Sequence, residues 1–252
     1  MTSLITLHAR RGARPVARAI PDARRDDERS PSLSASSSPP LSAVHRPANF
    51  NFRFAPAPIG GAWKRALDLT FASVATLLLC PIMLPVALFI CLDSPGPALF
   101  RQRRTGFRGR SFNVLKLRTM RAEPDSGHQA ERGDARVTRI GRFLRRTSID
   151  ELPQLLNVVA GDMSLVGPRP HAVDHDDMFW SVDADYARRF VARPGITGLA
   201  QVNGERGLSN TPEKVRRRVD FDLDYVDNWS MARDIAIIGS TIRVLAHDKN
   251  AY

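Results

Sequence analysis

The run LTFASVATLLLCPIMLPVALFICL, residues 69–92, contains no charged side chain. It exceeds the roughly 20 apolar residues that a helix needs to cross a bilayer. Pro81 and Pro85 lie in its middle, where each ring removes a backbone donor and clashes with the preceding helical turn. We therefore predict a membrane helix that is sharply bent and broken at Pro81.

The charges on the two sides of this run predict where its ends lie. Lys64 and Arg65 precede the run, and three arginines follow it within residues 101–104. Lys and Arg favour the cytoplasmic face of a membrane, so both ends are expected there. A re-entrant hairpin satisfies both the charges and the two prolines. A single kinked span and a buried core helix of a soluble protein are the alternatives.

Composition divides the chain into three parts. Residues 1–58 are rich in Pro, Ser, Ala and Arg and have few large apolar residues. We predict a disordered tail there, able to lie on anionic lipid. The membrane segment is placed at residues 59–97, and the third part, a folded domain, at residues 98–252. Cys80 and Cys91 both lie in the apolar run, so no disulfide framework or cysteine zinc site is available.

The folded domain at residues 98–252 is predicted to have a helix-dominated α+β fold. Residues 101–118 suggest a short hairpin whose second strand, 112–118, carries Lys116 and Arg118 on one face. A basic amphipathic helix at 138–146 could lie in the lipid headgroup layer or against a core. Two further helices are expected, at about 212–228 and 232–245, and no βαβ series is visible.

The stretch TSIDELPQ, residues 147–154, places two carboxylates at the start of a predicted helix. Ser148 and Glu151 have the spacing of a capping box, and acidic side chains suit the first turn of a helix. Asp150 would then lie at the positive helix end, which would keep it ionised. Capping and chemistry are therefore both open for this pair.

The surroundings of the pair favour chemistry on phosphate. Arg145 precedes it, and two loops rich in Gly and Pro follow, holding Arg169 and Arg193. Such loops expose backbone N–H groups, and arginine forks suit phosphate oxygens. One carboxylate among such groups could attack phosphorus, and its neighbour could hold a divalent cation against a diphosphate.

Four motifs carry a resemblance to a known family: KLRTM at 116–120, TSIDELPQ at 147–154, GDMSLVGPRP at 161–170 and RPGITGLAQVNG at 193–204. In order and spacing they resemble the bacterial sugar transferases, the monotopic polyprenyl-phosphate phosphoglycosyl transferases. The resemblance runs from about Trp63 to the C-terminus. It implies a small cytosolic catalytic domain attached to a re-entrant membrane helix, at the cytoplasmic face of a bacterial inner membrane.

The resemblance also implies a reaction: a sugar-1-phosphate moves from a UDP-sugar to undecaprenyl phosphate, and UMP is released. Asp150 matches the nucleophile that forms a covalent phosphosugar intermediate, and Glu151 matches its acidic partner. Mg²⁺ is the implied cofactor, with both carboxylates as its candidate ligands. The basic positions implied to bind phosphate or substrate are Lys116, Arg118, Arg145, Arg169 and Arg193.

The substrate and the assembly state are less constrained. The segment from Gly167 to His175 and the ending KNAY look closest to members that transfer glucose-1-phosphate to begin exopolysaccharide synthesis. Galactose-1-phosphate and an N-acetylated amino sugar stay open, as does homo-oligomerisation. His171 and His175 have the spacing of a helical metal pair, but no Glu follows the first His as in metalloproteases.

Two readings from other classes explain less. The formal net charge of +11 implies anionic partners and would suit nucleic acid. However, the arginines lie close to apolar sequence, and no zinc-finger or RNA-recognition motif is visible, so no nucleic-acid partner is expected. A non-catalytic membrane-anchored scaffold would explain the apolar run and the charge, but not the carboxylate pair among phosphate-type loops.

Overall fold

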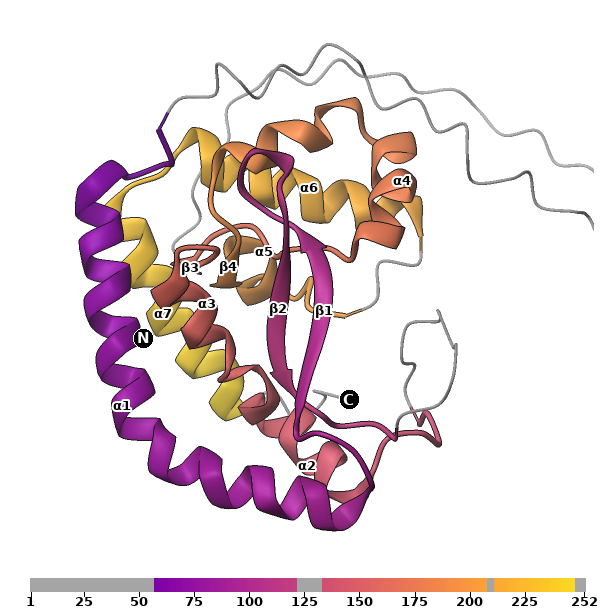
Figure 1. Ribbon diagram of the computed structural model, residues 1–252. Coiled ribbons are helices and arrows are strands. Elements are labelled where there is room, and N and C mark those ends of the chain that lie inside the picture. Colours follow the sequence, from indigo (N-terminus) through magenta and orange to yellow (C-terminus); the bar gives the residue numbers. More distant parts are fainter. Residues whose placement is uncertain (1–56, 122–132, 208–210, 248–252) are drawn as a thin grey trace, which may run out of the picture. The chain divides into compact units, whose positions relative to one another are not determined.

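The computed structural model describes residues 57–121, 133–207 and 211–247 (Figure 1). The predictions for the tail before residue 57, for His175's side chain and for the KNAY ending lie outside this part of the chain. Helices dominate, joined by two two-stranded sheets, which confirms a helix-rich α+β fold.

The apolar run forms most of α1, Gly61–Asp93, a single helix of 33 residues. The predicted break at Pro81 is wrong in one respect, because helical structure continues through Pro81 and Pro85. The predicted bend is present, since Figure 1 shows α1 turning partway along its length. By length and apolar composition α1 could cross a membrane. Many of its large apolar side chains are exposed, among them Phe71, Leu77 and Leu92, whereas Ile90 is buried.

The first turns of α1 are tied to elements far along the chain. Lys64 forms an ion pair with Asp234 of α7, Met231–His247. Arg65 donates to the carbonyls of Val158 and Val159 at the end of α3, Gln154–Ala160. One turn later, the Asp68 carboxylate accepts from the Ser164 hydroxyl at 2.7 Å. These charged bonds fix the start of α1 to the folded domain.

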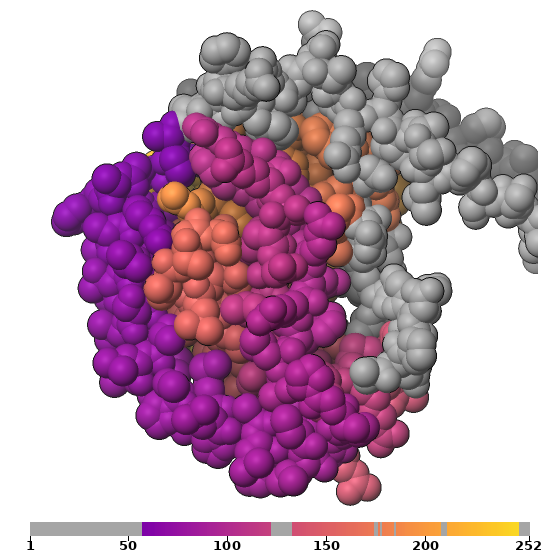
Figure 2. Space-filling model, in the orientation of Figure 1, coloured from indigo at the N-terminus to yellow at the C-terminus, as the bar shows by residue number. Residues whose placement is uncertain are grey.

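The last turn of α1 is tied to the same domain by Arg118. Its guanidinium donates to the carbonyls of Ile90, Ser94 and Pro95. Carbonyls at a helix C-terminus lack intrahelical partners, so a buried cation satisfies them well. In the space-filling view α1 runs along the left and lower margin of the described residues (Figure 2). Both ends of the apolar helix therefore contact one folded body.

The predicted hairpin is confirmed. β1, Leu99–Thr105, pairs antiparallel with β2, Ser111–Leu117, through the short turn η3, Phe107–Gly109. Asn157 of α3 holds β2, since its Oδ1 accepts from Leu115 N and its Nδ2 donates to the Asn113 carbonyl. β2 ends at Leu117, so Lys116 and Arg118 do not share one strand face as the alternation predicted.

The basic amphipathic helix is α2, Arg139–Thr147. Leu144 is buried, whereas Phe143 is half exposed. Gly141 lies against the backbone after β2, where an added Cβ would be 2.0 Å from the Thr119 carbonyl oxygen. This close approach needs a glycine and places the first turn of α2 against the segment that follows β2.

The remaining elements form the rest of the domain. β3, Ser164–Val166, pairs parallel with β4, Gly195–Thr197. Between these two strands lie α4, Val173–Val182, and η5, Ala184–Val191. After β4 come α5, Leu199–Val202, and α6, Pro212–Asp227. The helices predicted at 212–228 and 232–245 correspond to α6 and α7.

Two of the buried clusters each join three elements of the fold. In the first, three aromatic and two aliphatic side chains join α4, η5 and α6: Phe179, Tyr186, Phe190, Val215 and Val219. A second cluster joins α1, β2 and α3: Ala72, Val114, Leu155, Val158 and Met163. Burial of this kind supplies the main driving force for packing helices against a hairpin. The second cluster places the carboxylate stretch at the junction of α1, β2 and α3.

Candidate active site

The carboxylate pair lies in η4, Ile149–Glu151, a single 3-10 turn between α2 and α3. The predicted capping box is wrong. Ser148 ends α2 with a left-handed φ of 56°, and its side chain makes no capping bond. Its hydroxyl instead accepts from Arg206 Nη2 at 3.1 Å. The two carboxylates are therefore placed by a tight turn before a helix and not by a helix cap.

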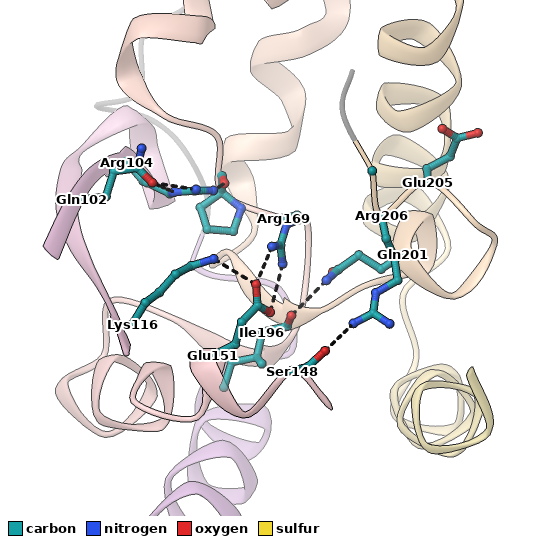
Figure 3. A network of polar contacts seen from close by, with 12 residues as sticks. Gln102, Arg104, Lys116, Ser148, Glu151, Arg169, Ile196, Gln201, Glu205 and Arg206 are labelled. Atoms are coloured by element: carbon teal, nitrogen blue, oxygen red, sulfur yellow. Dashed lines mark hydrogen bonds and ion pairs between the residues drawn. The ribbon is translucent and has the colours of Figure 1, made fainter. Parts of the chain in front are cut away.

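Two cations hold Glu151. Lys116 Nζ of β2 lies 3.0 Å from Oε1, and Arg169 Nη2 lies 2.6 Å from the same oxygen. Arg169 Nη1 also donates to Oε2 at 3.3 Å, which makes the pair bidentate. Figure 3 shows Lys116 and Arg169 converging on this carboxylate. Three of the predicted site residues, far apart in sequence, are thus in direct contact.

The charges in this cluster shift one another's pKa values. Burial alone would raise the pKa of Glu151, but the charges and hydrogen bonds of Arg169 and Lys116 hold it well below its usual range. Burial lowers the pKa of Lys116, and the Glu151 charge opposes that shift. Glu151 is therefore a permanent anion that neutralises part of a cationic site.

Asp150 has a different environment from its neighbour. It is 8% exposed, and no hydrogen bond to its carboxylate is found within the described residues. Burial, and then the Glu151 charge, raise its pKa to about 6, while Lys116, Arg145 and Arg169 act in the opposite direction. The expectation that a helix end would favour ionisation is thus wrong in direction. Asp150 is still mostly ionised at neutral pH.

Arginines surround this pair on further sides. Arg145 of α2 donates through Nε to Thr119 Oγ1 at 2.9 Å, and its charge favours the Asp150 anion. Arg104 of β1, which sequence reasoning did not single out, donates to the Pro170 carbonyl. Burial and the Arg169 charge lower the pKa of Arg104 to about 10. Side chains alternate between the two faces of β1. This alternation, combined with the register of the hairpin, is the signal that could have identified Arg104.

A buried polar network supports the loop between β3 and α4 that carries Arg169. Arg189 donates to the Arg169 carbonyl at 2.5 Å and pairs with Asp222, both side chains being almost fully buried. His171 Nδ1 lies 2.9 Å from Arg189 Nη1, and its ring stacks on Phe179. Burial and the nearby arginines hold the pKa of His171 well below its usual range. His171 is therefore a core histidine that supports this loop.

Two of the predicted phosphate-binding arginines lie elsewhere. Arg118 is committed to the carbonyls at the end of α1. Arg193 donates through Nε to the Gly161 carbonyl at 3.1 Å, and its charge interacts with Arg65 and Asp68 near the start of α1. Neither guanidinium joins the Glu151 cluster. Both have structural contacts that a loop composition cannot reveal.

Metal-ligating groups are sparse in the described residues. No group of three or more His, Cys, Asp or Glu side chains there could hold a metal ion. Both Glu151 oxygens already accept from cations, so Asp150 offers the more available carboxylate. Mg²⁺ commonly binds through one or two carboxylates together with substrate phosphates. Asp150 fits such a site better than Glu151 does.

Two polar side chains from the segment after β4, Arg206 and Gln201, lie near the cluster. Arg206 reaches Ser148, and Gln201 Nε2 donates to the Ile196 carbonyl at 3.1 Å (Figure 3). Arg206 follows the RPGITGLAQVNG motif by two residues, so a wider window around that motif would have included it. Together the residues form a cationic site around Asp150, whose carboxylate accepts no hydrogen bond within the described residues. Such a site can bind a diphosphate and present a nucleophile to it.

Comparison with known proteins agrees with this chemistry. The profile of the family "Bacterial sugar transferase" matches residues 59–248. A UDP-glucose:undecaprenyl-phosphate glucose-1-phosphate transferase of Caulobacter vibrioides is 55% identical over 75% of this chain and 72% of its own length. The same-named protein of Escherichia coli is 46% identical, over 75% of this chain but only 41% of its own.

A shorter relative is covered almost completely. The exopolysaccharide production protein PSS of Rhizobium leguminosarum is 47% identical over 71% of this chain and 92% of its own length. The chain therefore spans less than half of the Escherichia coli relative but most of the shorter ones. On the profile match, which includes α1 and the whole carboxylate site, the chain belongs to the bacterial sugar transferase family.

Proposed function

We propose that this protein transfers glucose-1-phosphate from UDP-glucose to undecaprenyl phosphate and releases UMP, as a first membrane step of exopolysaccharide synthesis. The observation that carries this function is the carboxylate of Asp150. It is buried without a hydrogen bond in the described residues, beside cations that hold Glu151. The names of the Caulobacter and Escherichia coli relatives support UDP-glucose and undecaprenyl phosphate as the substrates.

In the first step an Asp150 oxygen attacks the phosphorus that carries the sugar. A bond forms between that phosphorus and the carboxylate, and the bond to the bridging oxygen of UMP breaks. Lys116, Arg145 and Arg169 contribute positive charge where the phosphate oxygens gather charge. Burial helps here too, because it removes water from the nucleophile and strengthens each of these attractions.

In the second step a phosphate oxygen of the lipid acceptor attacks the same phosphorus. The bond to Asp150 breaks, its carboxylate is regenerated, and the product is an undecaprenyl diphosphate sugar. Glu151 keeps Lys116 and Arg169 in place through both steps. Its carboxylate is held in ion pairs with both cations, so it does not act as a second nucleophile. Mg²⁺, held through Asp150 and substrate phosphate, would neutralise diphosphate charge and favour departure of UMP.

The same proposal places the protein on a membrane. A straight helix of 33 residues would span about 50 Å, more than the hydrocarbon core. Yet its first turn is bonded to α7 and its last turn to Arg118, within one folded body. A bent helix that enters and leaves by the same face meets both conditions. Basic flanks favour the cytoplasmic face of the inner membrane.

A half-reaction tests this function directly. The full chain in lipid nanodiscs is incubated with UDP-glucose and Mg²⁺ but without acceptor, and its intact mass is measured. We expect a phosphoglucose adduct and an equal amount of UMP, both lost in Asp150→Asn. Asp220→Asn, on the exposed face of α6, is the matched control and should form the adduct.

The outcomes separate the alternatives. An adduct from UDP-galactose or a UDP-N-acetyl amino sugar, and none from UDP-glucose, would change the sugar but keep the reaction. A membrane-anchored scaffold predicts that no UDP-sugar gives adduct or UMP, even with undecaprenyl phosphate present. That last result would refute the enzymatic function.

A further inference from the structure

A cavity of about 140 Å³ lies directly beside the carboxylate site. Its lining is contributed by η4 and the residues after it, by α3, β4 and α5, and by the last turns of α7. Six of the lining side chains are aliphatic: Leu152, Leu155, Ile196, Val202, Val244 and Leu245. Glu151 belongs to the lining as well, so the cavity adjoins the Lys116 and Arg169 cluster.

The polar members of the lining mark a second property of this cavity. Thr197 and Thr241 bond to each other through their hydroxyls at 2.6 Å, so neither hydroxyl needs a ligand. Arg206 donates to Ser148, and within residues 57–121, 133–207 and 211–247 no carboxylate pairs with its guanidinium. An apolar cavity with one cation lacking an anionic partner suits an amphiphile with an anionic head.

The cavity is also continuous with an exposed apolar surface. One side of α7 presents Ile235, Ile238, Ile242 and Leu245, which are exposed by 66, 38, 65 and 41%. We call this set the α7 apolar face. Leu245 belongs both to this face and to the cavity lining. Apolar residues gathered on one helix face mark a site for lipid or another apolar partner.

The volume indicates how much hydrocarbon the cavity can hold. A dry protein cavity of about 150 Å³ lined by aliphatic and aromatic side chains binds a six-carbon ring such as benzene. The cavity here is of that size and can take about one branched five-carbon unit. A polyprenyl chain is built of such units, with its phosphate attached to the first of them.

A nucleotide base is the competing occupant. The Gln201 side chain is 4% exposed, and its Oε1 has no hydrogen-bond partner in the structure, so it could accept from a uracil N–H. However, no aromatic ring for stacking occurs among the described lining residues, and the lining is mainly aliphatic. The continuity with the α7 apolar face further favours a ligand that arrives from lipid.

We propose that this cavity binds the isoprene unit next to the phosphate of the polyprenyl acceptor, with Arg206 pairing with the phosphate. This inference rests on the proposed function and adds an acceptor site to it. The lipid chain would then continue over Leu245 and the α7 apolar face into the bilayer. The acceptor phosphate would lie beside Glu151, close to the phosphosugar on Asp150.

Val244→Phe tests the site by filling the cavity. The variant is assayed in two parts: adduct formation from UDP-glucose without acceptor, and transfer of the adduct to undecaprenyl phosphate. We expect adduct formation at the wild-type rate and a KM for undecaprenyl phosphate raised about tenfold, as for the loss of one good apolar contact. Arg206→Gln should raise the same KM. Ala236→Phe, at an exposed position of α7 outside both the cavity lining and the α7 apolar face, should change neither part.

Other outcomes overturn the assignment. Slower adduct formation and a raised KM for UDP-glucose in Val244→Phe, with an unchanged acceptor KM, would assign the cavity to the uracil of the donor. Wild-type behaviour in both parts would show that the cavity binds neither substrate. If wild-type protein forms no adduct at all, the proposed function fails, and acceptor binding is then measured by itself. A diazirine-bearing polyprenyl phosphate should cross-link to α7 in wild type and much less in Val244→Phe; equal labelling would refute the site.

Discussion

Arg169 forms a bidentate ion pair with Glu151: its Nη2 lies 2.6 Å from Oε1 and its Nη1 lies 3.3 Å from Oε2. Lys116 reaches the same Oε1 from β2, so one carboxylate joins the hairpin to the loop after β3. The arrangement fixes two cations whose charge a diphosphate needs. Asp150, the neighbouring residue, has no such ion pair within the part of the chain that the structure describes.

Glu151→Gln should destabilise the protein, because it removes the carboxylate charge that pairs with both Lys116 and Arg169. Breaking a buried ion pair by removing one partner costs about 3–5 kcal/mol. Thermal unfolding in nanodiscs should show a clear drop in Tm. The double variant Glu151→Gln/Lys116→Met should recover part of it, since one unpaired cation is gone. Strictly additive losses in this double-mutant cycle would contradict direct coupling of the two side chains.

The pH dependence of adduct formation should report the ionisation of Asp150. Only the carboxylate attacks phosphorus, and its pKa of about 6 means that the rate should rise through that pH and level off above it. Glu151 is one cause of the raised pKa. Single-turnover rates of Glu151→Gln should therefore reach their plateau at lower pH than wild type. A plateau shifted to higher pH would show that Glu151 acts on Asp150 in another way.

Sequence reasoning selected the carboxylate pair that lies among the cations of the site, but not its geometry. Motif spacing was enough to select Asp150 and Glu151, and alternation was enough for the hairpin. The predicted cap at Ser148 is wrong, because Ser148 ends α2 in the left-handed region and its hydroxyl accepts from Arg206, which lies 58 residues away. The family resemblance implied a phosphate-binding role for Arg118. Its commitment to α1 carbonyls follows from long-range packing, which no local pattern encodes.

Asp150→Asn should raise stability while abolishing the reaction. A carboxyl group whose pKa is higher in the folded than in the unfolded state binds more protons in the folded state. The protein therefore loses stability as the pH rises from the unfolded pKa to the folded pKa. For Asp150 these are 3.8 and about 6, a loss of about 3 kcal/mol that is complete above pH 6. The Tm advantage of Asp150→Asn over wild type should be small near pH 4.5 and larger at pH 7.5. A constant advantage would mean that Asp150 is not desolvated.

Arg118→Met separates a structural role from a phosphate-binding one. Hydrogen bonds from a charged donor contribute about 1.5–3 kcal/mol each, and this residue makes several to the end of α1. We expect a large fall in Tm. Gly96→Ala should act similarly, because its Cβ would lie 2.2 Å from Arg118 Nη1. Arg110→Met, at an exposed arginine, is the control. An unchanged Tm with a raised KM for UDP-glucose would restore the phosphate-binding role.

Labelling with a membrane-impermeant maleimide tests the path of α1. Single cysteines replace Ala62 and Arg101, which are exposed before and after the apolar helix, in a background with Cys80 and Cys91 changed to Ser. Lys64 and Arg118 tie the two ends of α1 to one domain, so in sealed inside-out vesicles both cysteines should be labelled from the outside. In right-side-out vesicles neither should react until the membrane is opened. Labelling of one cysteine in each orientation would show a full crossing and would require the Lys64–Asp234 contact to be absent in the membrane.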